Sequence, residues 1–229
     1  MAGGIAQQSR NLFLTTGIAG IAAVLGLAGG QGLILVGGGE PRFDAPAVAV
    51  QRFFESRNTG LFATGSYLTV ISLVIFLWFV AGVSALLREA GEEGPWRANL
   101  ALASGAVLVA TGILGAWELA AFRVHEGLDP RVARLVFDMG NLWFANSWVV
   151  LGSFSLASGW AMVSARLAPR WLGWLAIVAG VGLVAARGMW TTPFWLFPYG
   201  LFWIWVVVLS VRLIRRRPRP YDAQVSATA

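Results

Sequence analysis

The chain has 229 residues, of which 57% are hydrophobic and only 12% are charged, whereas about a quarter of the residues in a soluble domain are charged. It contains no cysteine and no lysine, which excludes disulfides, thiolate metal sites, cysteine nucleophiles and Schiff-base cofactors. Its single histidine, His125, excludes any site that needs two histidines from one chain.

About six apolar stretches follow one another along the chain, with the length needed to cross a hydrocarbon layer about 30 Å thick as a helix. We predict membrane helices over residues 12–36, 61–87, 98–122, 141–165, 171–186 and 190–214. The sequence therefore predicts an all-α fold, a polytopic transmembrane helical bundle. This bundle forms a single domain over residues 1–214, and residues 215–229 form a basic cytoplasmic tail.

The first stretch follows Arg10 and so begins like a signal peptide. It is longer than the apolar region of a signal peptide, and it lacks a convincing small-residue cleavage site. We therefore interpret it as a retained membrane helix.

Two segments between the predicted spans begin with an Asp and a Pro, a signature of helix starts: Asp44 with Pro46, and Asp129 with Pro130. After the second, apolar residues recur on one helical face, at Val132, Leu135, Val136 and Met139. Both segments are too short to span a membrane. We predict two short amphipathic helices on the outer surface, the second of which ends at Gly140.

All 17 basic residues are arginines, and their distribution predicts the orientation. With both termini in the cytoplasm, ten arginines lie on the inner side and seven on the outer side, as the positive-inside rule favours. We interpret the five arginines of residues 212–219 as a membrane anchor and not as a nucleic-acid site. The chain is thus expected in the inner (plasma) membrane.

Two parts of the sequence resemble each other. Residues 10–17 are similar to residues 97–105, and Val-Ser-Ala recurs near the inner ends of two later helices, at 83–85 and 163–165. Residues 170–172 open a third pair of helices. Two interpretations remain open: three parallel helical hairpins, as in some transporters, or chance similarity among helices rich in small residues.

Polar and aromatic residues near the predicted outer helix ends form the candidate site, because ionisable groups in membrane spans are costly and are often functional. We expect them to converge in an outward-facing polar cup beside a segment kinked by Pro193 and Pro198. The candidate ligand-binding residues are Glu118, His125, Asp138, Asn141, Arg187, Trp190 and Trp195.

Two chemical interpretations of Glu118 remain open. It either pairs with Arg187 or Arg123 and pins helices together, or it is partly desolvated and handles a proton or a cationic ligand. A metal site from Glu118, His125 and Asp138 has suitable ligand types but no diagnostic spacing, and we expect no metal and no cofactor.

The segment Leu167-Ala-Pro-Arg-Trp-Leu-Gly-Trp174 follows a very short inner loop and opens the fifth helix. With the length and the six-span layout, it resembles bacterial integral membrane proteins classed only as domains of unknown function. This resemblance implies a six-helix membrane fold and assigns no functional residue.

We expect a non-catalytic membrane module that binds or transports a small amphipathic or lipid-like molecule through the polar cup. One alternative is a small intramembrane enzyme that uses Glu118, His125 and Asp138, although no hydrolase, P-loop or dinucleotide-binding motif is present. Another is an accessory subunit of a larger membrane complex. The expected partners are the bilayer, the amphipathic ligand, and a second membrane protein or a second copy of the chain.

Overall fold

The computed structural model describes residues 2–36, 38–90, 95–113, 116–123, 126–165 and 167–216. These residues are helical and contain no strand, which confirms the all-α prediction. The helices are α1 (Ala2–Ile34), α2 (Ala47–Glu55), α3 (Thr59–Ala90), α4 (Trp96–Gly112), α5 (Ala116–Arg123), α6 (Pro130–Ala165), α7 (Arg170–Gly188), the short η2 (Pro193–Trp195) and α8 (Leu196–Arg215). Six candidate spans among them confirm a multi-pass membrane protein.

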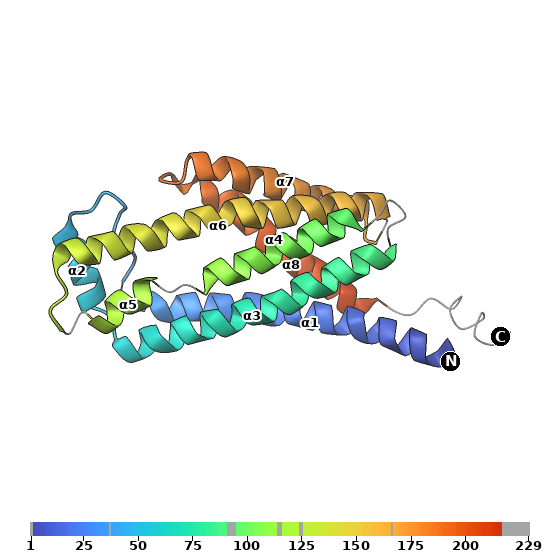
Figure 1. Ribbon diagram of the computed structural model, residues 1–229, viewed down its shortest axis with the longest axis horizontal. Helices are drawn as coiled ribbons and strands as arrows, with labels where there is room; N and C mark the ends of the chain where they lie inside the picture. Colours follow the sequence, from blue (N-terminus) through green and yellow to red (C-terminus); the bar gives the residue numbers. More distant parts are fainter. Residues whose placement is uncertain are drawn as a thin grey trace.

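The long helices form a closed ring in chain order. Helix α1 packs on α3, α3 on α4, α4 on α6, α6 on α7 and α7 on α8, and α8 packs back on α1. The ring consists of three antiparallel hairpins, α1/α3, α4/α6 and α7/α8. We call the end that holds the start of α1 and the end of α8 the basic end, and the opposite end, which carries α2 and α5, the loop end (Figure 1).

Aromatic side chains fill the middle of the ring. Phe76 and Phe79 of α3 meet Phe154 of α6 and the side chains of Phe202 and Trp205 from α8, and all five are fully buried. Their ring centroids lie 5.5 Å apart for Phe76 and Phe79, and 6.0 Å apart for Phe76 and Phe154. Further edge-to-face contacts join Phe154 to Phe202 at 6.3 Å and Phe79 to Trp205 at 6.3 Å. The interior at this level is therefore a packed core.

Small residues let neighbouring helices approach closely, as expected where lipid gives helices no hydrophobic reason to associate. Helices α6 and α7 meet through Gly159 and Gly173, and a methyl group placed on Gly159 would lie 2.6 Å from the Gly173 carbonyl oxygen. Nearby, the Ser155 hydroxyl donates a hydrogen bond of 2.8 Å to the carbonyl oxygen of Ala176. Helices α1 and α3 meet in the same way at Gly30 and Gly65.

One glycine in the first helix of each hairpin faces the second helix of the preceding hairpin around the ring. A methyl group on Gly17 would lie 2.7 Å from the Ser210 carbonyl oxygen of α8, and one on Gly173 would lie 2.9 Å from the Gly159 carbonyl oxygen of α6. Gly105, which aligns with Gly17 in the sequence, faces α3 too, but it meets the side chain of Val80 and not a carbonyl oxygen. This arrangement is compatible with three parallel hairpins, one of the two interpretations of the sequence similarity.

The second predicted surface helix is wrong as a separate element. Residues 130–140 continue without a break into the following span, and α6 has 36 residues, about 54 Å at 1.5 Å per residue. Gly140 does not end the helix, and the Trp117 side chain occupies the place where a Cβ of residue 140 would stand, so a larger residue would not fit there. The first surface helix exists as α2, but its apolar face packs on the protein: Val50, Phe53 and Phe54 are buried.

The third predicted span is described as two helices, α4 and α5. Residues 114 and 115, between these two helices, lie outside the described residues, and one candidate span covers both helices. Glu118 lies in the first turn of the short helix α5.

The close approach of α1 and α3 generates a matched test. A methyl group on Gly30 would lie 2.8 Å from the Gly65 carbonyl oxygen, whereas one on Gly32 would meet no atom within 4 Å. We expect Gly30→Ala to lower the free energy of unfolding by about 1–3 kcal/mol, the usual cost of overpacking. Gly32→Ala is expected to be neutral or to stabilise by up to about 1 kcal/mol. Unfolding by a denaturing detergent, followed by circular dichroism, measures both, and equal stabilities would contradict the assigned packing.

Candidate functional site

The loop end has a small core of its own, separate from the aromatic core of the ring. We call α2, α5 and the first turns of α6 the cap, and its buried side chains include Phe54, Ala121 and Phe137. The Trp117 ring stacks on Phe137 with centroids 5.4 Å apart, and the Trp117 indole N–H donates to the Phe137 carbonyl oxygen at 3.3 Å. The cap is therefore a packed unit with buried side chains and its own hydrogen bonds.

A buried arginine fixes the connection from α1 to α2. Only 6% of Arg57 is exposed, and its guanidinium donates hydrogen bonds to the carbonyl oxygens of Val36 at 3.0 Å and Gly38 at 2.7 Å. The guanidinium also lies 4.1 Å from the centre of the Phe53 ring. Burial lowers the pKa of Arg57, and the nearby Glu40 carboxylate opposes that shift. An arginine titrates so far above neutral pH that it stays charged here.

A second arginine ties α6 to the same connection. The Arg134 guanidinium binds the Asp138 carboxylate one turn later at 2.8 Å and donates to the Phe43 carbonyl oxygen at 2.7 Å. It also donates to the Ala45 carbonyl oxygen. The Arg134 and Asp138 side chains are only 27% and 38% exposed. Asp138 therefore orients an arginine that holds the segment before α2.

This segment in turn contacts the end of the third hairpin. The Phe43 ring meets the Trp190 ring edge to face, with centroids 4.4 Å apart. Arg187, in the last turn of α7, lies 5.9 Å from the Trp190 ring and donates a 2.7 Å hydrogen bond from Nε to the Asn146 side-chain oxygen. We call these contacts the loop-end network, formed by Phe43, Arg134, Asp138, Asn146, Arg187 and Trp190.

Three of the predicted site residues, Asp138, Arg187 and Trp190, thus belong to one network. Trp195 lies in a different cluster, where it stacks on Trp148 with centroids 5.3 Å apart. Asn141 donates to the Phe137 carbonyl oxygen one turn earlier in α6.

Glu118 is partly exposed and forms no ion pair with Arg187 or Arg123. Arg187 binds Asn146, and Arg123 pairs with Glu126 at 2.6 Å. His125 lies outside the described residues. Among the residues that are described, no three His, Cys, Asp or Glu side chains gather as metal ligands.

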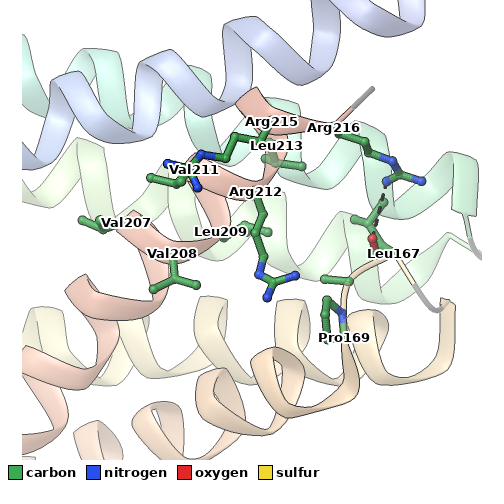
Figure 2. A pocket seen from close by; sticks show the side chains of 11 residues that line it. Leu167, Pro169, Val207, Val208, Leu209, Val211, Arg212, Leu213, Arg215 and Arg216 are labelled. Carbon is green, nitrogen blue, oxygen red and sulfur yellow. Dashed lines mark hydrogen bonds between the residues drawn. The ribbon is translucent and has the colours of Figure 1, made fainter. Parts of the chain in front are cut away.

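A groove of about 580 Å³ at the basic end was not predicted as a site (Figure 2). Its walls are the last turns of α8 and the connection between α6 and α7, and three arginines border it, Arg212, Arg215 and Arg216. Their spacing of three and four residues puts them within one helical turn. The spacing of these arginines is visible in the sequence, but we interpreted it only as a membrane anchor. Their position beside Pro169 is visible only in the structure.

The Arg134 contacts generate a second prediction. In Arg134→Met the carbonyl oxygens of Phe43 and Ala45 lose a charged donor, and such hydrogen bonds contribute about 1.5–3 kcal/mol each. We expect amide hydrogen exchange over residues 38–46 to accelerate at least about tenfold. The control is Arg131→Met, an exposed arginine in the same helix. Unchanged amide exchange in Arg134→Met would show that the Arg134 hydrogen bonds do not hold residues 38–46 in place.

Comparisons with family models, with curated proteins and with solved structures find no match to this chain. The resemblance of residues 167–174 to bacterial membrane proteins of unknown function stays an expectation. The roles of the residues above rest on their contacts.

Proposed function

We propose that this protein is a non-catalytic membrane protein that binds a small amphipathic or lipid-like molecule at the loop-end network. The observation that carries the proposal is Arg187, a cation in the last turn of a candidate membrane span whose hydrogen-bond partner is a neutral amide, Asn146. No described carboxylate pairs with Arg187, so its charge is available to an anionic group of a ligand. The expected ligand has a polar or anionic head.

Arg187 is suited to hold such a head. A guanidinium has five N–H donors, and the Nε donor is the one bonded to a described residue. The C-terminal end of α7 favours a positive charge at this position, because the helix dipole is negative there. The remaining donors are left for acceptor oxygens of a ligand.

The neighbouring aromatic rings offer an apolar surface for the rest of the molecule. Phe43 and Trp190 meet beside Arg187, and Phe194 and Phe197, which follow in the chain, are 42% and 67% exposed. A ligand with one polar and one apolar part matches this combination. The packed aromatic core of the ring favours binding at the loop end over passage through the middle of the bundle.

The charge distribution supports an orientation with the loop end outside and both termini in the cytoplasm. By the sequence, the basic end has ten arginines and four carboxylates, Glu89, Glu92, Glu93 and Asp222, and seven of these arginines are among the described residues. The loop end has seven arginines and seven carboxylates. Because the cytoplasmic side of membrane proteins carries the excess of basic residues, the basic end fits the cytoplasmic leaflet of the plasma membrane.

The proposal is tested by native mass spectrometry of protein extracted into nanodiscs directly from its own membrane. We expect the wild type to retain a stoichiometric small molecule. In Arg187→Ala the affinity for this molecule is expected to fall at least about tenfold, because a charged hydrogen bond contributes about 1.5–3 kcal/mol. The control is Arg52→Ala, which removes an exposed arginine from the same end.

Equal retention in Arg187→Ala and the wild type would contradict the proposal. Equal loss in Arg52→Ala would show that general charge at the loop end, and not Arg187, holds the molecule. Trp190→Ala is expected to weaken retention as well, since it removes the aromatic surface beside the guanidinium.

A further inference from the structure

The groove at the basic end combines two surfaces of different chemistry. One side is apolar, with Val207, Val208 and Val211 of α8 facing Leu167 and Pro169 across it. The rim is cationic, with Arg212, Arg215 and Arg216 in the last turn of α8 and directly after it. Figure 2 shows the Arg212 side chain extending toward Pro169, whereas Arg215 extends away from it.

The three arginines differ in how they are held. Arg216 is fixed by contacts of its own: it donates to the Leu167 carbonyl oxygen at 3.4 Å and lies 4.5 Å from the centre of the Phe13 ring. Arg212 lies 5.4 Å from the centre of the Trp171 ring, and no described carboxylate pairs with Arg212 or Arg215. Two guanidinium groups at the rim are thus not neutralised by the described part of the protein.

The position of the groove along the bundle matches the boundary of a membrane. The valines belong to the candidate span that ends at Arg215, so they border the hydrocarbon layer, and the arginines stand where that span ends. Trp171 and Trp174 in the first turns of α7 are 50% and 55% exposed, as expected for aromatic residues at the level of the lipid headgroups. The apolar wall therefore lies at acyl-chain depth and the arginines at headgroup depth.

We propose that this groove binds one anionic phospholipid of the surrounding leaflet, with the phosphate at Arg212, whose side chain extends toward Pro169, with Arg215 adding positive charge at the rim, and with an acyl chain along the valines of α8. Basic pockets between membrane helices attract anionic headgroups, and a single positive charge near such a surface contributes about 1 kcal/mol. A soluble anion would satisfy the arginines and leave the apolar wall unused. This proposal goes beyond ligand binding at the loop end and does not depend on it.

The test uses the full chain in nanodiscs that contain equal amounts of phosphatidylglycerol and phosphatidylcholine, and native mass spectrometry counts the lipids retained after release. The wild type is expected to prefer phosphatidylglycerol. In the double variant Arg212→Gln with Arg215→Gln, this preference is expected to fall about thirtyfold, which corresponds to about 1 kcal/mol for each arginine. The matched control is Arg10→Gln with Arg88→Gln, which removes two exposed arginines of the same end that do not line the groove.

Three outcomes would overturn the proposal: no preference in the wild type, an equal fall in the control variant, or displacement of phosphatidylglycerol by inorganic phosphate at matched ionic strength. No preference in the wild type would mean that the groove does not select phosphatidylglycerol. An equal fall in the control variant would assign retention to nonspecific charge, and displacement by phosphate would identify a site for soluble anions. Val208→Asn tests the apolar wall, because it leaves all arginines in place and is expected to weaken retention. Helical circular dichroism confirms that each variant is folded.

Discussion

Helices inside a bilayer gain nothing by excluding water from each other, so the assembly of this ring depends on how closely their backbones approach. Glycine and serine provide that approach at α1/α3 and at α6/α7, where carbonyl oxygens lie within van der Waals reach of the glycines opposite. Aromatic side chains from α3, α6 and α8 then fill the space that the ring encloses. Small residues at the helix–helix contacts and large residues at the centre together give a closely packed bundle. The cap and the groove are both built on this frame.

The spans were predictable because the signal is local: a helix that crosses a bilayer needs a long apolar run, whatever it packs against. The continuity of α6 was not predictable in the same way. Gly140 follows Asp138 and precedes Asn141, a run typical of a helix end, but the helix continues through it, and the Trp117 ring, 23 positions earlier in the chain, packs against this glycine. Tertiary packing here outweighs a local preference of about 1 kcal/mol.

Several residues of the candidate site could be predicted from the sequence, but their contacts with one another could not. The sequence located Asp138, Arg187 and Trp190 near one end of the bundle, and the structure joins them through Phe43. The contact between Arg134 and Phe43 spans 91 positions, so no spacing rule could reveal it. Arg57 was missed for the same reason, because its acceptors are backbone carbonyl groups, which every residue has. Of the two interpretations of Glu118, the ion pair with Arg187 or Arg123 is not formed, because Arg187 binds Asn146 and Arg123 pairs with Glu126.

The charge of the basic end has a consequence for how the protein responds to its surroundings. By the sequence, all ten basic residues of this end are arginines, since the chain has no lysine, and they outnumber its four carboxylates. Guanidinium groups do not release their protons at any pH that a cell reaches, so the positive charges of this end stay in place when the pH changes. The range over which these charges act on surrounding anions is instead set by dissolved salt, since the screening length falls from about 30 Å at 0.01 M to about 8 Å at 0.15 M ionic strength. The electrostatic reach of these arginines therefore depends on ionic strength and not on pH.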